Sequence, residues 1–177
     1  AAVREAIDGN SFIGRIERRF RIPVRVLSGA EEAQLSAFGL LANIPAADGL
    51  FGDLGGGSLE LVSLSKGKIK NSASLMLGHL VLAERSDGSR KRADSLIDGD
   101  LDALSWLRRL KGRTLYLTGG AWRTIARILL EQTNHPLHII DGYEVDADKV
   151  SQTASVLSGL SDKTLLKIET LSPRRAG

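Results

Sequence analysis

The fold of this chain is constrained most by residues 53–61, which read DLGGGSLEL. An acidic residue ends an apolar approach, three glycines follow, and an alternating apolar stretch comes next. This order predicts a strand, a tight turn and a second strand. Glycines tolerate positive φ and let backbone N–H groups approach an anion, Ser58 adds a hydroxyl donor, and Asp53 is suited to holding a metal ion. The run therefore predicts a phosphate-binding turn, although an ordinary hairpin turn would also explain its glycines.

Two further glycine-containing segments strengthen this interpretation. Residues 29–33 read GAEEA, and residues 117–123 read LTGGAWR. In the second segment a predicted strand, a glycine pair and the start of a helix follow one another, and the first N–H groups of a helix bind anions readily. Gly119 and Gly120 are therefore candidates for a second anion-binding turn.

Composition indicates an ordinary globular protein, since 42% of the 177 residues are hydrophobic and 25% are charged. No apolar run approaches the roughly 20 residues that cross a bilayer, and the first residues do not read as a secretory signal. We therefore expect a cytoplasmic protein with no membrane partner. The formal charge of +3 is spread over basic clusters with few aromatic residues between them. Nucleic acid is accordingly not an expected partner.

The absence of cysteine excludes disulfides and thiolate metal sites. The three histidines, His79, His135 and His138, are not spaced as zinc ligands. Any metal is therefore expected to be a hard cation with oxygen ligands, such as Mg²⁺.

Mixed helical and strand patterns predict an α/β fold. Ser28 followed by Glu31 is a capping-box pattern, which begins one of the predicted helices. Helices are predicted over residues 12–20, 30–41, 78–84, 96–107 with an interruption at 98–100, 121–130, 146–160 and 165–168. Strands are predicted at residues 24–27, 50–51, 59–64, 68–77, 114–118 and 138–140, those from 50 to 77 forming an antiparallel meander. A five-stranded mixed sheet with helices on both faces is expected within residues 50–140.

The order of the motifs resembles that of a known family. The segments AVREA, LSGAEEA, DLGGGSLEL, LGHL, TGGAWR and LSPRRA follow one another between Ala2 and Ala176. In this order they resemble the exopolyphosphatase and guanosine pentaphosphatase (Ppx/GppA) family. The resemblance implies an actin-like ATPase fold, in which two ribonuclease-H-like domains surround a cleft. Residues 1–42 would be the end of the first domain, and residues 43–177 an incomplete second domain.

The resemblance also implies roles for individual residues. Glu32 would activate the attacking water and Arg4 would bind phosphate, while Asp53 and Glu60 would serve Mg²⁺ or water. The phosphate loops implied are Gly55, Gly56, Gly57 and Ser58, with a further turn at Gly119 and Gly120. From the residues alone, Glu32 is explained equally well as a helix-dipole or capping partner, a role that its neighbour Glu31 could fill instead, and Arg4 is explained as a surface salt bridge.

The expected function is hydrolysis of terminal phosphate from polyphosphate or guanosine pentaphosphate by metal-assisted water attack, which implies a part in the stringent response. Two alternatives stay open: a non-catalytic regulator that binds guanosine tetraphosphate or pentaphosphate, and a sugar kinase or chaperone-type ATPase. The family's first phosphate loop is missing from the sequence. We therefore expect an internal fragment that is nearly inactive alone, taken from a longer protein that is a candidate homodimer.

Overall fold

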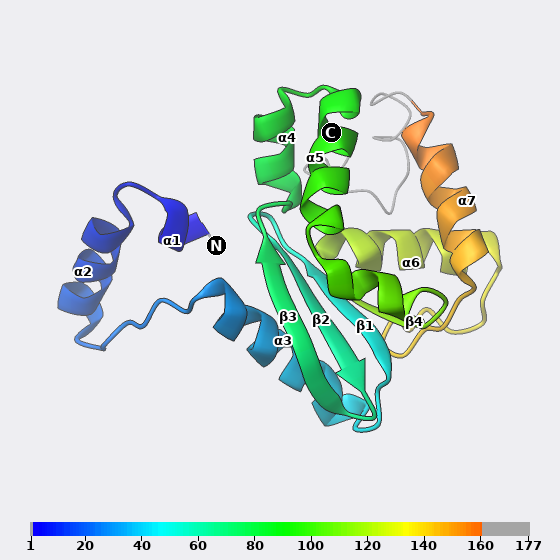
Figure 1. The fold of residues 1–177 in the computed structure, drawn as a ribbon, viewed down its shortest axis with the longest axis horizontal. Helices are drawn as coiled ribbons and strands as arrows, with labels where there is room; N and C mark the ends of the chain where they lie inside the picture. Colours follow the sequence, from blue (N-terminus) through cyan, green and yellow to red (C-terminus); the bar gives the residue numbers. More distant parts are fainter. Residues whose placement is uncertain (1, 161–177) are drawn as a thin grey trace. The chain divides into compact units, whose positions relative to one another are not determined.

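The computed structural model describes residues 2–160 (Figure 1). The chain divides into two compact units, Ala1–Leu117 and Thr118–Gly177. The predicted boundary between residues 42 and 43 concerns two domains of a longer protein, does not coincide with this division, and stays a prediction.

A sheet with the strand order β3-β2-β1-β4 is the centre of the first unit. Its strands are β1 (Gly49–Leu54), β2 (Leu59–Ser65), β3 (Lys68–Leu75) and β4 (Thr114–Gly119). The pairs β1–β2 and β2–β3 are antiparallel. β4 runs parallel to β1, because Gly49 lies beside Thr114 and Gly52 lies beside Leu117. The sheet is mixed, as predicted, but within residues 2–160 it has four strands and not five.

Two segments predicted as strands, residues 24–27 and 138–140, form no strand. Both alternate apolar and polar residues, but a strand also needs a neighbour that accepts and donates its backbone hydrogen bonds. No strand in the described part of the chain pairs with either segment. Val26 and Ile139 are accordingly exposed to solvent.

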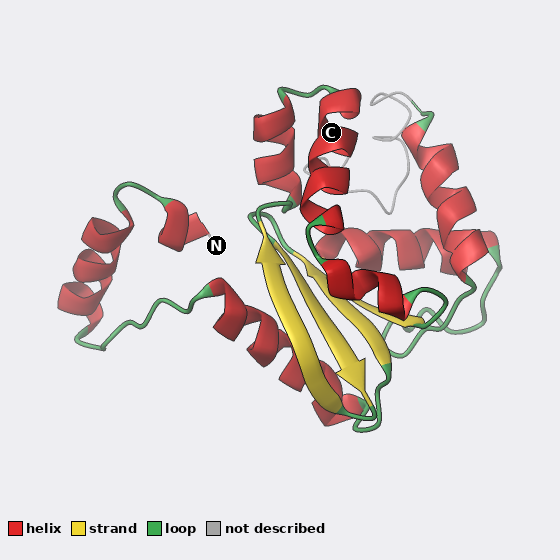
Figure 2. Ribbon diagram, in the orientation of Figure 1, coloured by secondary structure: helices red, strands yellow, loops and turns green. Residues whose placement is uncertain are grey.

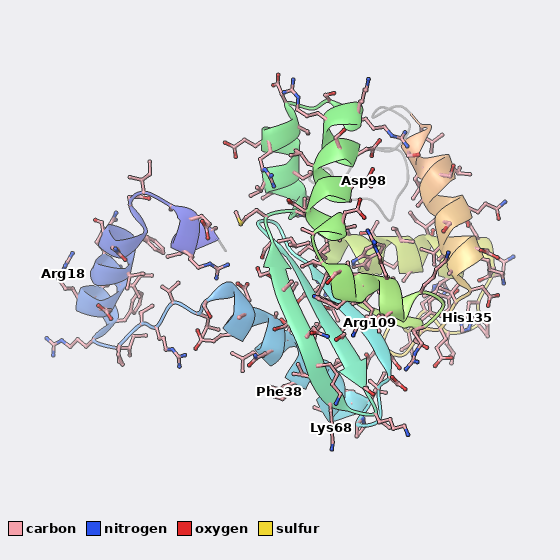
Figure 3. All side chains as sticks on the ribbon, viewed as in Figure 1. Arg18, Phe38, Lys68, Asp98, Arg109 and His135 are labelled. Atoms are coloured by element: carbon pink, nitrogen blue, oxygen red, sulfur yellow. The ribbon has the colours of Figure 1, made fainter. Side chains whose placement is uncertain are left out.

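Helix α3 (Gly29–Asn43) covers one face of the sheet and begins with the predicted capping box at Ser28 and Glu31. Its small residues Ala33 and Ala37 are fully buried against a core of Phe51, Val62 and Leu64. Each of the three larger side chains contributes about 1.5–3 kcal/mol by burial. Leu35 and Phe38, which also have helical spacing, are instead exposed, Phe38 by 56% (Figure 3). Because α3 turns alanines toward the sheet, its backbone lies close to the strands.

The other helices of the first unit are α1 (Ala2–Glu5), α2 (Gly9–Phe20), α4 (His79–Ser86), α5 (Arg90–Asp102) and the 3₁₀ helix η1 (Ser105–Leu110). Helices α4 and α5 lie side by side (Figure 1). The interruption predicted at residues 98–100 is not present, since α5 runs through it. A single glycine inside a helix costs only about 1 kcal/mol, and Ser89 caps the start of α5.

The second unit contains α6 (Gly120–Gln132) and α7 (Ala147–Ser158), close to their predicted ranges (Figure 2). The helix predicted at residues 165–168 lies outside the described residues. Within residues 2–160, no helix is both long enough and apolar enough to span a bilayer.

Candidate functional site

A row of polar residues crosses the sheet beside the glycine loop. Asp53 on β1 pairs with Glu60 on β2, which in turn pairs with Ser74 on β3. Directly paired residues point to the same face of a sheet, so the three side chains are neighbours. The Ser74 hydroxyl donates a 2.9 Å hydrogen bond to Oε1 of Glu60, whose side chain is only 3% exposed. The structure thus brings together the two residues that the resemblance assigns to a metal, Asp53 and Glu60.

The first turn of α3 lies against this row. A Cβ atom on Gly29 would stand 2.7 Å from Cβ and 2.9 Å from Oγ of Ser74, a distance that real Cβ atoms essentially never show. Only glycine therefore lets the helix start so close to β3. Glu32 lies in this first turn, where the helix dipole favours a carboxylate.

Arg4 of α1 makes hydrogen bonds to the first turn of α3 and to the residues just before it. Its Nη1 donates to the Leu27 carbonyl at 2.8 Å and to Oε2 of Glu32 at 3.2 Å, and its Nε donates to Glu5 at 3.2 Å. The side chains of Arg4 and Glu32 are 23% and 34% exposed. The structure therefore places these two predicted site residues together across 28 positions of sequence. The ion pair agrees with the salt-bridge alternative for Arg4, but a guanidinium has five N–H donors, enough to bind a phosphate as well.

The capping role that sequence left open belongs to Glu31. Its carboxylate accepts from the backbone N–H and the hydroxyl of Ser28, both at 2.9 Å, and it also pairs with Arg25. Glu32 is therefore not needed to cap α3, although it sits one residue further along the same turn.

The glycine loop, residues 55–58, joins β1 to β2. It is closed by a 3.0 Å hydrogen bond from the Gly55 N–H to the Ser58 carbonyl, and Ser58 is buried with 3% exposure. The N–H groups of Gly56, Gly57 and Ser58 donate to no acceptor among residues 2–160. Three successive N–H groups without a protein partner are what an anion-binding loop provides.

The other glycine turn belongs to the second unit. Gly119 has φ of +112° and directly precedes α6, which starts at Gly120. The Thr124 hydroxyl donates to the Gly120 carbonyl at 3.1 Å. The same unit has an open hollow of about 720 Å³ lined by Leu129, His135 and Tyr143 among others, but none of the predicted site residues lines it.

The residues present suit magnesium. Mg²⁺ in phosphate-handling sites is bound by one or two carboxylates together with substrate phosphates and water. Asp53 and Glu60 are two adjacent carboxylates on either side of the loop. In the part of the chain that is described, no three His, Cys, Asp or Glu residues group closely enough to hold a metal by themselves.

Sequence reasoning gave no role to Ser74, Gly29, Gly78 or His79. Ser74 and Gly29 meet only through folding, since they are distant in sequence. The segment LGHL, which contains Gly78 and His79, was part of the family pattern, and the structure places it against the glycine loop.

Comparison with known proteins gives a family match over the whole sequence. A sequence model of the Ppx/GppA phosphatase family matches residues 1–177. Among curated proteins, "Retrograde regulation protein 2" of Saccharomyces cerevisiae is 25% identical over an alignment 175 residues long, and the match covers 88% of this chain and 30% of the yeast protein.

Solved structures agree with this match. An exopolyphosphatase from Cytophaga hutchinsonii has a TM-score of 0.82 at 24% identity, with 99% of this chain and 60% of that chain covered. The Ppx/GppA family member from Aquifex aeolicus has a TM-score of 0.68 at 21% identity, covering 99% and 59%. These identities show the fold alone, and the predicted actin-like α/β fold is confirmed. The chain spans about three fifths of the structural relatives and under a third of the yeast relative.

Proposed function

Because the chain belongs to the Ppx/GppA phosphatase family, we propose that the full-length protein hydrolyses phosphoanhydrides. Its substrates are inorganic polyphosphate or guanosine pentaphosphate, from which it releases the terminal phosphate. One observation carries the proposal: the N–H groups of Gly56, Gly57 and Ser58 have no acceptor within residues 2–160, and carboxylates flank their loop.

The loop binds the terminal phosphate groups. Backbone N–H groups offset negative charge without the reorganisation that water would need, and this favours a transition state in which charge builds on phosphate oxygens. The Ser58 hydroxyl adds one donor and the Arg4 guanidinium adds positive charge near Glu32. Gly119 and Gly120, considered within the second unit alone, form a second anion-binding turn at the start of α6.

Asp53 and Glu60 would hold Mg²⁺. When bound, the ion neutralises charge on the phosphate oxygens. Ser74 keeps the buried Glu60 carboxylate in one orientation through its hydroxyl. Hydrogen bonds of this kind to a metal ligand fix its direction and raise its affinity for the metal.

Glu32 orients and deprotonates the attacking water. The water oxygen forms a bond to the terminal phosphorus, the phosphoanhydride P–O bond breaks, and the shortened chain leaves with the electron pair. The proton of the water passes to the Glu32 carboxylate. The hydrogen bond from Arg4 limits the rotamers of that carboxylate, which keeps it ready for this step.

The test is phosphate release by the full-length protein from polyphosphate and from guanosine pentaphosphate, with and without Mg²⁺. We expect release that depends on the metal, from at least one of the two substrates. No release from either substrate by folded, Mg²⁺-loaded protein would refute the proposal.

A non-catalytic regulator is the second candidate, because the yeast relative is named for regulation. In that case the same loops bind guanosine tetraphosphate or pentaphosphate without cleaving it. Calorimetry with the nucleotide on the sample used for phosphate release separates the two, since a regulator binds and does not release phosphate. The sugar kinase alternative gains no support from the family match. A homodimer, a cytoplasmic location and a part in the stringent response stay predictions.

A further inference from the structure

The first turn of α4 is capped by the glycine loop and not by a side chain. The three first N–H groups of a helix have no partner inside it and need one outside. Those of His79, Leu80 and Val81 donate to the carbonyls of Gly55 at 3.2 Å and of Gly56 at 3.0 and 3.4 Å. The N-cap residue, Gly78, has no side chain to offer. The start of α4 is therefore occupied by the loop and is not itself an anion site.

His79 makes a second contact with the loop. Its ring Nδ1 lies 3.1 Å from the Gly55 carbonyl oxygen. A carbonyl only accepts hydrogen bonds, so Nδ1 carries the proton in this contact. The Gly55 carbonyl thus accepts from both the backbone and the ring of His79.

Gly78 makes this approach possible. A Cβ atom on Gly78 would stand 2.3 Å from the carbonyl carbon of Gly57 and 2.4 Å from that of Gly56. Both obstacles are backbone atoms of the loop, which cannot rotate away as a side chain would. Any other residue at position 78 would push the loop and α4 apart.

The direction of these carbonyls fixes the direction of the loop's donors. The chain has no cis peptide bonds within the described residues, and in a trans peptide the C=O and the following N–H point in opposite directions. Since the carbonyls of Gly55 and Gly56 point to α4, the N–H groups of Gly56 and Gly57 point away from it. We propose that Gly78 and His79 are positioning residues that turn these two N–H groups toward the terminal phosphate, an inference that rests on the proposed function.

Variants of His79 test this in the full-length protein, with an imido-bridged triphosphate analogue that resists hydrolysis as the probe. In His79→Asn the side-chain amide nitrogen takes the place of Nδ1, so the contact with Gly55 is kept. In His79→Gln the donor is moved one carbon further, and in His79→Ala it is removed. Losing one hydrogen bond predicts about three- to tenfold weaker binding for Gln and Ala, with Asn close to wild type. KM for tripolyphosphate should rise by the same factor. A role in folding alone would leave the affinity of folded Gln and Ala variants for the analogue unchanged.

Gly78→Ala is the stronger variant and should abolish measurable binding. If it does not fold, the His79 series decides the question alone. Wild-type binding by all three His79 variants would overturn the inference and leave the proposed function intact. A wild-type protein that does not bind the analogue would overturn the proposed function, and the inference with it.

Discussion

The two glycine turns of this protein use glycine for different reasons. In the loop at residues 55–58, none of the glycines has a positive φ, and α4 approaches the loop backbone because Gly78 at the start of α4 has no side chain. Gly119 instead has φ of +112°, a conformation that other residues avoid. Glycine therefore allows close packing where Gly78 meets the first turn, and an unusual backbone conformation at the second.

Their surroundings differ as well. Asp53 and Glu60 flank the first glycine turn, and Ser74 donates a hydrogen bond to Glu60. Gly29, in the same first turn of α3 as Glu32, lies against Ser74. The second turn leads straight into α6, without a side-chain cap. We therefore propose that the chemistry belongs to the loop at residues 55–58 and its neighbours, and that the turn at Gly119 contributes binding and backbone geometry.

The largest expected effect is at Glu32. Removing a positioned base slows turnover by about 100-fold or more, so Glu32→Gln should lower phosphate release from polyphosphate by at least this factor. Glu31→Gln is the matched control, because it changes a neighbouring carboxylate that caps α3 and pairs with Arg25. Since Gln also fits the N3 position of a capping box, its main effect should be a small loss of stability, about 0.3–1 kcal/mol, from removing a charge at the helix N-terminus. Wild-type turnover in Glu32→Gln would contradict the proposal that the reaction takes place at the glycine loop, residues 55–58, and the residues around it.

The second-largest effect is expected for Ser74→Ala, which should weaken activation by Mg²⁺. Without its hydroxyl, the Glu60 carboxylate loses the hydrogen bond that orients it, and such losses cost about tenfold or more in metal affinity. The measurement is the Mg²⁺ concentration that gives half-maximal phosphate release. Ser72→Ala, two residues earlier on β3 and paired with Val62, is the control and should behave as wild type. An equal shift in both variants would mean that the effect is general to the strand.

Gly119→Ala should lower stability more than activity. Forcing alanine into this conformation costs about 1–3 kcal/mol, which urea unfolding of the full-length protein would measure. If the variant unfolds at the same urea concentration as wild type, the positive φ at this turn has no energetic importance.

The smallest effect on stability is expected for Gly56→Ala. The added methyl would meet the flexible end of Leu80 at 3.2 Å, so the free energy of unfolding should change by less than about 1 kcal/mol. Affinity for the triphosphate analogue should change little, since the methyl lies on the side of α4 and the N–H groups of Gly56 and Gly57 point away from α4. If Gly56→Ala were destabilised as much as Gly119→Ala, the two turns would not differ in how strongly their stability depends on glycine.

Local patterns in the sequence were enough to predict much of this arrangement. Ser28 and Glu31 form a capping box within four residues, and a turn at residues 55–58 sets Asp53 opposite Glu60. The family resemblance gave Arg4 and Glu32 separate roles in one site, but the ion pair between them was not predicted, because it joins separate elements. The face of α3 that turns to the core could not be predicted, because Leu35 and Phe38 also have helical spacing. The sheet decides that Ala33 and Ala37 are buried instead.

Contacts between segments that are distant in sequence could not be predicted from the sequence. Gly29 against Ser74 and Gly78 against Gly57 are close approaches that no local pattern encodes. Residues 24–27 have the alternation of a strand but no pairing partner within the described chain. The prediction of a fifth strand was wrong for the same reason, because pairing decides whether an alternating segment becomes a strand.

The most direct test is a crystal structure of the full-length Glu32→Gln protein with Mg²⁺ and tripolyphosphate. We predict terminal phosphate oxygens at about 2.9 Å from the backbone nitrogens of Gly56 and Gly57, with the metal between the phosphate and Asp53. Phosphate bound elsewhere, with these N–H groups facing only water, would contradict the account.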